Sequence, residues 1–157
     1  MKIVIGILAW NEENSIAATI ASLESQTLLR RADGQGLIVE IQVVPNGCTD
    51  RTAEVAARAL DKLKGTFPAL TCRVDSLPEG GKSNAWNALV HGLAPADADY
   101  FLMMDADIEL LTPETLERMW QALETDPHAY ISTDTPVKHL TRKKSLSLID
   151  RLLLGAG

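Results

Sequence analysis

Two aspartates follow a short apolar segment in the second half of the chain. Residues 100–104 (YFLMM) lead directly into Asp105-Ala106-Asp107. Because an apolar run bounded by polar residues is typical of a buried strand, both carboxylates are expected at the C-terminal end of that strand. Hard cations such as Mg²⁺ and Mn²⁺ take oxygen ligands, and in nucleotide sites they bind one or two carboxylates plus substrate phosphates. Asp105 and Asp107 are therefore candidate metal ligands, and an ordinary solvated loop is the alternative.

Further polar and aromatic side chains follow the other predicted strands. In open α/β sheets, ligands bind outside the carboxyl ends of the strands, so these side chains are expected along one edge. A nucleotide diphosphate would use an aromatic ring for its base, amide and carboxylate groups for base and ribose, and a lysine with a metal for its phosphates. The set consists of Trp10, Glu12, Asn46, Lys82, Asp105 and Asp107.

Members of this set also have purely structural interpretations. Trp10 is expected either to stack on a base or to pack under a neighbouring loop. Glu12 or Glu13 can stabilise the N-terminus of the following helix, where a negative charge is worth roughly 0.3–1 kcal/mol. Asn46 opens an Asn-Gly turn. Lys82 precedes a predicted helix, where it either contacts a phosphate or belongs to a solvated turn.

Two common nucleotide motifs are excluded. Gly81-Lys82-Ser83 ends like a P-loop, but Ser76 stands where that motif needs its first glycine. The first strand-to-helix turn, residues 10–14 (WNEEN), lacks the glycine fingerprint of a dinucleotide fold.

The hydrophobic pattern alternates between strands and helices. Ser15 is expected to cap the first helix, and Thr49 or Asp50 the second. Strands are predicted over residues 2–9, 37–44, 70–74, 100–105 and 130–133, and helices over 15–26, 50–64, 83–92 and 113–125, with a break over 28–36. This alternation indicates an α/β fold with a mostly parallel sheet and helices on both faces.

The composition is that of one globular domain. The chain has 157 residues, 46% of them hydrophobic, and a net charge of −6. Residues 1–137 carry a net charge of −10 and offer no basic patch for nucleic acid, whereas residues 138–157 carry +4. Cys48 and Cys72 have neither the spacing nor the neighbours of a zinc site. The apolar N-terminus is too short for a signal peptide or a membrane span, so a cytoplasmic protein is expected.

Four segments resemble, in order and context, the nucleotide-binding half of family 2 glycosyltransferases, which have the GT-A fold. They are LAWNEE at 8–13, VVPNGCTDRT at 43–52, GKSNAWN at 81–87 and DAD at 105–107. The resemblance spans roughly residues 1–135. It implies a GT-A type α/β domain and transfer of a sugar from a UDP- or GDP-linked donor, with inversion at the anomeric carbon.

The resemblance also implies a role for each matching residue. Leu8, Trp10 and Glu12 would surround the base and ribose, and Val44 and Asn46 would contact the edge of the base. Lys82 would contact the diphosphate. Asp105 would contact the ribose or a metal-bound water, and Asp107 would ligate Mn²⁺ or Mg²⁺. One departure concerns the second strand, where the family often carries paired aspartates and this chain has Pro45-Asn46. An amide accepts hydrogen bonds but adds no charge, so the preferred base is left open.

The general base of the reaction is not recognised in this chain. The family places it in an acceptor-binding half downstream, and neither Asp134 nor Asp150 stands in a recognisable version of that motif. We expect a donor-binding domain over residues 1–137. The basic and then amphipathic tail over 138–157 is expected either to begin the acceptor-binding half, or to contact a partner or the inner face of a membrane.

The sequence leaves two other functions open. One is a non-catalytic module that keeps the nucleotide pocket for regulation or assembly. The other is a nucleotidyltransferase, which shares the α/β layout and a metal-binding aspartate but usually has a glycine-rich basic loop after the first strand. Residues 10–14 contain no such loop.

Overall fold

The computed structural model describes residues 1–32 and 36–135, and its strands form one parallel sheet. The strand order is β3-β2-β1-β4. The central strand, β1, pairs with β2 on one side and β4 on the other. The strands are β1 (Lys2–Ala9), β2 (Ile38–Pro45), β3 (Thr71–Val74) and β4 (Tyr100–Asp105). The predicted α/β fold with a parallel sheet is confirmed.

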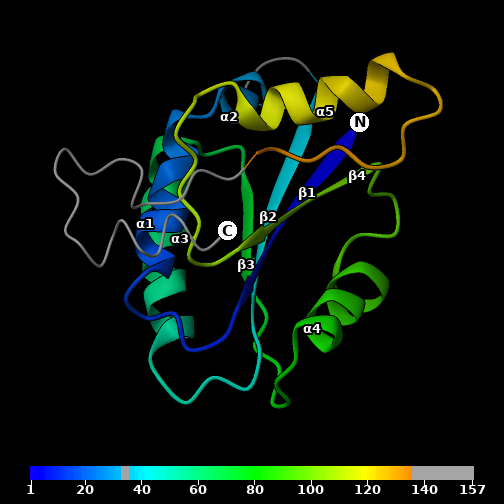
Figure 1. The fold of residues 1–157 in the computed structure, drawn as a ribbon. Helices are drawn as coiled ribbons and strands as arrows, with labels where there is room; N and C mark the ends of the chain where they lie inside the picture. Colours follow the sequence, from blue (N-terminus) through cyan, green and yellow to red (C-terminus); the bar gives the residue numbers. More distant parts are fainter. Residues whose placement is uncertain (33–35, 136–157) are drawn as a thin grey trace, which may run out of the picture.

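Helices cover both faces of this sheet (Figure 1). The helical elements are α1 (Ile16–Ser22), η1 (Leu23–Ser25), α2 (Thr27–Ala32), α3 (Thr52–Thr66), α4 (Lys82–Ala88), η2 (Leu89–Leu93) and α5 (Thr115–Thr125). The larger core packs alternate residues of β1 and β2, such as Ile5 and Ile41, against α1, α2, α3 and α5. The opposite face packs Leu8 and Val44 against Ala85 and Leu89 of α4 and η2.

Gly6 allows the smaller helical layer to approach β1 closely. A Cβ atom at this position would lie 2.2 Å from Cδ2 of Leu89, which is fully buried. Since real Cβ atoms essentially never make contacts this short, a larger residue at position 6 would force the Leu89 side chain to move. This close packing helps to hold α4, whose first residue is Lys82, at the edge of the sheet.

The strand predicted over residues 130–133 is wrong. These residues form no strand, and the side chains of Tyr130 and Ile131 are 89% and 82% exposed. Their local preference for an extended conformation does not make a strand, because a strand also needs a neighbouring strand for its backbone hydrogen bonds.

The break predicted over residues 28–36 is wrong in its first part. Residues 27–32 form α2, which buries Leu28 and Leu29 completely. The helix expected over 15–26 ends at η1, because Gln26 is extended and its buried side chain donates a hydrogen bond to the carbonyl of Thr112 at 2.9 Å. Gln26 thereby connects the end of η1 to the chain just before α5.

No helix in residues 1–32 and 36–135 is long and apolar enough to cross a membrane. The predicted domain boundary at residue 137 and the basic, amphipathic tail over 138–157 lie outside the described residues.

Candidate donor-binding site

A cavity of about 630 Å³ lies at the carboxyl ends of β1, β2 and β4. Its lining brings together seven of the eight residues predicted for the site: Leu8, Trp10, Glu12, Asn46, Lys82, Asp105 and Asp107. These residues come from three strand ends and from the first residue of α4, so only the folded sheet makes them neighbours. Gly80 and Gly81, which were not predicted, complete the wall next to Lys82.

Val44 is the member of the predicted set that does not line the cavity. It is fully buried in the smaller core, where it packs with Leu8, Ala85 and Leu89. Side chains alternate between the two faces of a strand, and at position 44 this alternation points towards α4. Contact with a base edge stays a prediction for Val44, and its burial does not support it.

Asn46 is buried, and its amide group links three parts of the site. Its Nδ2 donates a hydrogen bond to the carbonyl of Ala9 at 2.7 Å, and its Oδ1 accepts one from the backbone N–H of Gly81 at 2.9 Å. The amide thus ties the end of β2 to the end of β1 and to the loop before α4. Within this structure Asn46 positions the cavity wall, a role that its sequence context did not indicate.

The Asn46-Gly47 turn approaches the loop at Gly80 very closely. Gly47 has a positive φ of 59°, and a Cβ atom there would lie 2.6 Å from the backbone nitrogen of Gly80. Only glycine satisfies both requirements, because an L-residue is strained at this φ and has no room for its side chain. The contact of the two turns sets the distance between the ends of β2 and α4.

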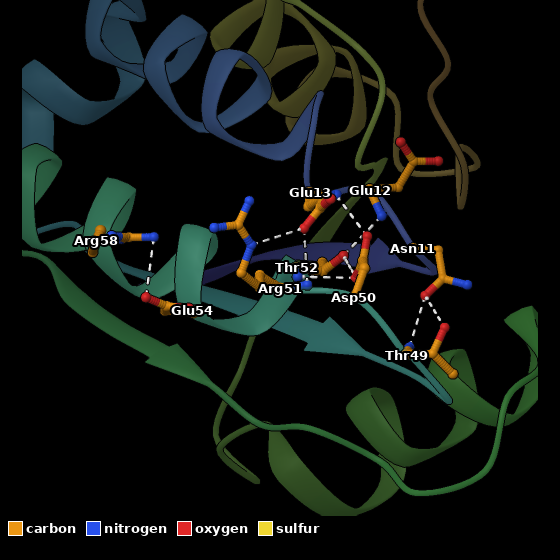
Figure 2. A network of polar contacts seen from close by, with 9 residues as sticks. All are labelled: Asn11, Glu12, Glu13, Thr49, Asp50, Arg51, Thr52, Glu54 and Arg58. Carbon is orange, nitrogen blue, oxygen red and sulfur yellow. Dashed lines mark hydrogen bonds and ion pairs between the residues drawn. The ribbon is translucent and has the colours of Figure 1, made fainter.

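Figure 2 shows a network of polar contacts that joins the β1–α1 turn to the β2–α3 turn. The Glu13 carboxylate accepts hydrogen bonds from the backbone N–H and Nε of Arg51 at 3.1 and 3.2 Å. In return, the Glu13 N–H donates to the Asp50 carboxylate at 3.1 Å. Glu13 is therefore a structural residue, whereas its neighbour Glu12 lines the cavity.

Asp50 and Thr52 complete this network. The N-cap of α3 is Arg51, whose side chain makes no capping hydrogen bond, so the prediction of Thr49 or Asp50 at this position is wrong. Asp50, one residue earlier, accepts a hydrogen bond from the Thr52 N–H at 3.0 Å. The Thr52 hydroxyl accepts one from the Glu12 N–H at 2.8 Å. Desolvation acts to raise the pKa of Asp50, but hydrogen bonds from Thr52 and from the Glu13 N–H outweigh it and hold this pKa below its ordinary value.

Asn11 bends the chain just after Trp10. It is the non-glycine residue with a positive φ, 54°, among the described residues, and its Oδ1 accepts a hydrogen bond from the Thr49 N–H at 2.8 Å. Asparagine tolerates this left-handed conformation better than most residues. Trp10 is left 64% exposed at the cavity, with its indole next to Gly80. Trp10 is therefore not packed under a neighbouring loop.

The acidic turn after β4 is held from below by α1. The Thr19 hydroxyl, buried beneath the turn, donates a hydrogen bond of 2.7 Å to the carbonyl of Ala106. Ala106 is itself buried, and it separates the two exposed or half-exposed aspartates. This contact orients Asp105 and Asp107 towards the cavity, and no local sequence pattern indicates it, because 87 residues separate the two partners.

Lys82 forms an ion pair with Asp105 inside the cavity. Its Nζ lies 2.6 Å from Oδ1 and 2.8 Å from Oδ2 of that carboxylate. Asp107 forms no hydrogen bond or ion pair with another residue in the part of the chain that the structure describes, and that part holds no group of three or more side chains suited to a metal. The protein therefore offers two carboxylates as metal ligands. This number fits a hard cation whose other ligands come from a diphosphate and water.

A second cavity, of about 620 Å³, adjoins the first and shares Asp107 with it. Its lining includes Thr112, Arg118 and Ser132, which lie on the loop before α5, on α5 and on the segment after it. No sequence pattern predicted this cavity, because the loop, the helix and the non-regular segment that form its walls carry no distinctive motif.

The parallel sheet with helices on both faces is similar to the fold of solved GT-A glycosyltransferases. TarS 1–349 from S. aureus has a TM-score of 0.58 and 22% sequence identity, over 80% of this chain and 33% of that chain. The mannosyltransferase PcManGT from Pyrobaculum calidifontis, solved in complex with GDP-Man and Mn²⁺, has a TM-score of 0.60 and 25% identity, over 80% of this chain and 32% of that one. The predicted GT-A type fold is confirmed.

The chain belongs to glycosyl transferase family 2, whose family model matches residues 4–149. A dolichol-phosphate mannosyltransferase from Pyrococcus furiosus is 28% identical over 124 residues, which make up 79% of this chain and 30% of that protein. The chain therefore spans about a third or less of the length of the proteins that it resembles. The family expected from the four sequence motifs is confirmed.

Proposed function

We propose that this chain is the donor-binding domain of a glycosyltransferase, which binds a nucleotide diphosphate-sugar together with a divalent cation for transfer of the sugar with inversion. The observation that carries this proposal is the single cavity lined by Trp10, Lys82, Asp105 and Asp107. An exposed indole, a lysine and two carboxylates are the groups that a base, a diphosphate and its cation require.

The proposed orientation of the donor follows from where these groups lie. The base would stack on Trp10, whose ring is exposed, with Leu8 and Glu12 beside the base and ribose. The diphosphate would lie across the cavity towards Lys82. The sugar would then point past Asp107 into the second cavity, which shares this residue and has polar walls at Thr112 and Ser132.

Asp107, with Asp105, would hold the Mn²⁺ or Mg²⁺ ion, which when bound stabilises the negative charge of the departing nucleotide diphosphate. Lys82 would add a second positive charge next to the same phosphates. Trp10 and the turn held by Asn11 would orient the base, so that the anomeric carbon is presented in one position. Inversion requires the acceptor hydroxyl to attack from the side opposite to the leaving nucleotide.

The names of related proteins support this proposal. Structures of TarS contain UDP and UDP-GlcNAc, and that of PcManGT contains GDP-Man and Mn²⁺. The nucleotidyltransferase alternative finds no support in the family match. A non-catalytic nucleotide-binding module stays an alternative function. Cytoplasmic residence and contact with a membrane stay predictions.

The proposal is tested by calorimetric titration of UDP and GDP into the chain, with and without Mn²⁺. We expect binding of at least one nucleotide that depends on Mn²⁺ in the wild type and is lost in Asp107→Ala. Asp61→Ala, which removes an exposed carboxylate on α3, is the matched control and should bind as the wild type does. Binding of neither nucleotide, or Mn²⁺-dependent binding that survives in Asp107→Ala, would contradict the proposal. Transfer is then assayed with the matching nucleotide-sugar, candidate acceptors and an added acceptor-binding half. Tight binding without any turnover under these conditions would favour the non-catalytic module.

A further inference from the structure

The Lys82 ammonium group occupies both carboxylate oxygens of Asp105 in this structure. The distances from Nζ are 2.6 Å to Oδ1 and 2.8 Å to Oδ2. The side chains of Lys82 and Asp105 are 70% and 45% exposed, so the ion pair is screened by water and contributes little to stability. A pair of this kind breaks readily when either partner is offered a stronger one.

Under the proposed function, on which this inference rests, Lys82 and Asp105 would each bind a group of higher charge than the other residue of the pair. A divalent cation would use the oxygens of Asp105, and a diphosphate would use the ammonium group of Lys82. The cation and the ammonium group compete for these two oxygens, because both are positively charged and repel each other at contact distance. Binding of one at Asp105 therefore weakens binding of the other.

We propose that Lys82 and the divalent cation exchange at Asp105. In the free protein Lys82 holds the carboxylate and competes with the cation. When cation and nucleotide bind together, the cation takes Asp105, and the released ammonium group binds the diphosphate. The cation and the nucleotide therefore bind cooperatively, and by linkage each raises the affinity for the other by the same factor.

The backbone around Lys82 allows this exchange without movement of the loop. The Gly81 N–H is held by Asn46 at 2.9 Å, and the Gly81 carbonyl accepts a hydrogen bond from the Ala85 N–H, also at 2.9 Å, within the first turn of α4. The peptide that precedes Lys82 is thus anchored on both sides. The exposed side chain is free to rotate between Asp105 and a phosphate, so the exchange needs only rotations about side-chain bonds.

The test measures binding of Mn²⁺ in the absence of nucleotide, from the electron paramagnetic resonance signal of the free ion. Four proteins form a double-mutant cycle: wild type, Lys82→Met, Asp105→Asn and the double variant. We expect Lys82→Met to bind Mn²⁺ about two- to five-fold more tightly than the wild type, the range given by the weak ion pairs of exposed side chains. In the Asp105→Asn background, the same substitution should leave the Mn²⁺ affinity unchanged.

The Asp105→Asn background is the control for a general effect of charge. If Lys82 only repelled the cation through the electric field, Lys82→Met would tighten Mn²⁺ binding equally in both backgrounds, and the inference would be overturned. An unchanged or weaker Mn²⁺ affinity in Lys82→Met would overturn it as well. Urea unfolding of all four proteins checks that these exposed substitutions leave the fold intact.

A second measurement separates this inference from the function on which it rests. The affinity for UDP or GDP is determined with and without Mn²⁺ in the wild type and in Lys82→Met. We expect the variant to bind the nucleotide more weakly and to lose part of the cooperativity between nucleotide and Mn²⁺. If nucleotide and Mn²⁺ bind with equal cooperativity in both proteins, the proposed exchange is wrong, but the proposed donor site is not contradicted. Failure of the wild type to bind any nucleotide overturns the donor site, and the exchange with it.

Discussion

The side-chain carbonyl of Asn46 accepts a hydrogen bond from the backbone N–H of Gly81 at 2.9 Å. The same amide group donates to the carbonyl of Ala9 at 2.7 Å, so one buried side chain connects the ends of β1 and β2 to the loop before α4. Lys82 follows Gly81 directly. The position of its ammonium group in the cavity therefore depends on the residue at position 46.

Substitution of Asn46 by alanine should destabilise the fold and weaken nucleotide binding together. It leaves the Gly81 N–H and a carbonyl at Ala9 with fewer partners, and a buried polar group without its hydrogen bond costs roughly 1–3 kcal/mol. Urea unfolding measures the first effect, and UDP or GDP titration the second. Asn84→Ala, which removes an exposed amide on α4, is the control. Wild-type stability in Asn46→Ala would show that the two bonds contribute nothing.

Gly47→Ala should cost more than about 1 kcal/mol of stability, because an L-residue is strained at a φ of 59° and its Cβ would meet the Gly80 backbone at 2.6 Å. Gly65→Ala is the matched control, since this glycine lies in α3 with nothing within 4 Å of an added Cβ. That substitution should stabilise the protein by roughly 0.5–1 kcal/mol. Unfolding free energies that shift in the same direction for both variants would contradict this account.

Thr19→Val should destabilise the protein by about 1 kcal/mol and weaken Mn²⁺-dependent nucleotide binding. Valine keeps the shape of the side chain but removes the hydroxyl that donates to the Ala106 carbonyl at 2.7 Å. The turn that carries Asp105 and Asp107 then loses its support from α1. Thr19→Ser, which keeps the hydroxyl, should retain the nucleotide affinity. Equal loss of affinity in both variants would assign the effect to packing instead of to the hydrogen bond.

Nucleotide binding should quench the fluorescence of Trp10, because stacking of a base on its ring brings the two π systems into contact. Trp10→Phe should remove most of the quenching, and Trp86→Phe, which changes a 43% exposed tryptophan of α4, should retain it. Trp10→Ala should weaken nucleotide binding by roughly 1–3 kcal/mol, the range for a base on an aromatic ring. Quenching that persists in Trp10→Phe would exclude the proposed place of the base.

Acid should weaken the contact between α2 and α5 through Glu117. Hydrogen bonds from Thr27 and Arg31 hold the pKa of Glu117 below its ordinary value of 4.5. Because the pKa is lower in the folded state, the contribution to stability is present above pH 4.5 and is lost as the pH falls through the folded value. Glu117→Gln should therefore be less stable than the wild type at pH 7, and this difference should shrink below pH 4.5.

Urea unfolding at a series of pH values measures this difference. Asp61→Asn, which changes an exposed carboxylate of α3, is the control and should leave the unfolding free energy nearly unchanged at each pH. A difference between wild type and Glu117→Gln that stays constant from pH 7 to pH 3 would contradict the role given to Glu117.

The predictions that rested on long patterns are confirmed by the structure. The apolar segments at residues 2–9, 37–44 and 100–105 form strands within one residue of the predicted bounds. The parallel pairing follows from the alternation with helices, and it carries seven of the eight predicted site residues to one cavity. The break predicted from residue 28 and the strand predicted over 130–133 were wrong, because the structure of each segment depends on what lies opposite it in space. Leu28 and Leu29 form a helix over a core, whereas Tyr130 and Ile131 have no strand to pair with.

The sequence by itself determined the α/β fold, the family and the edge of the sheet at which the candidate donor site lies. Hydrophobic periodicity acts locally, and parallel strands deliver all their carboxyl ends to one edge. Only the tertiary structure decided how the residues at that edge divide their roles. Asn46 and Glu13 connect loops, Val44 is buried, and Lys82 pairs with Asp105. These roles depend on contacts between residues far apart in the chain, and such contacts form only when the two turns and α4 pack together.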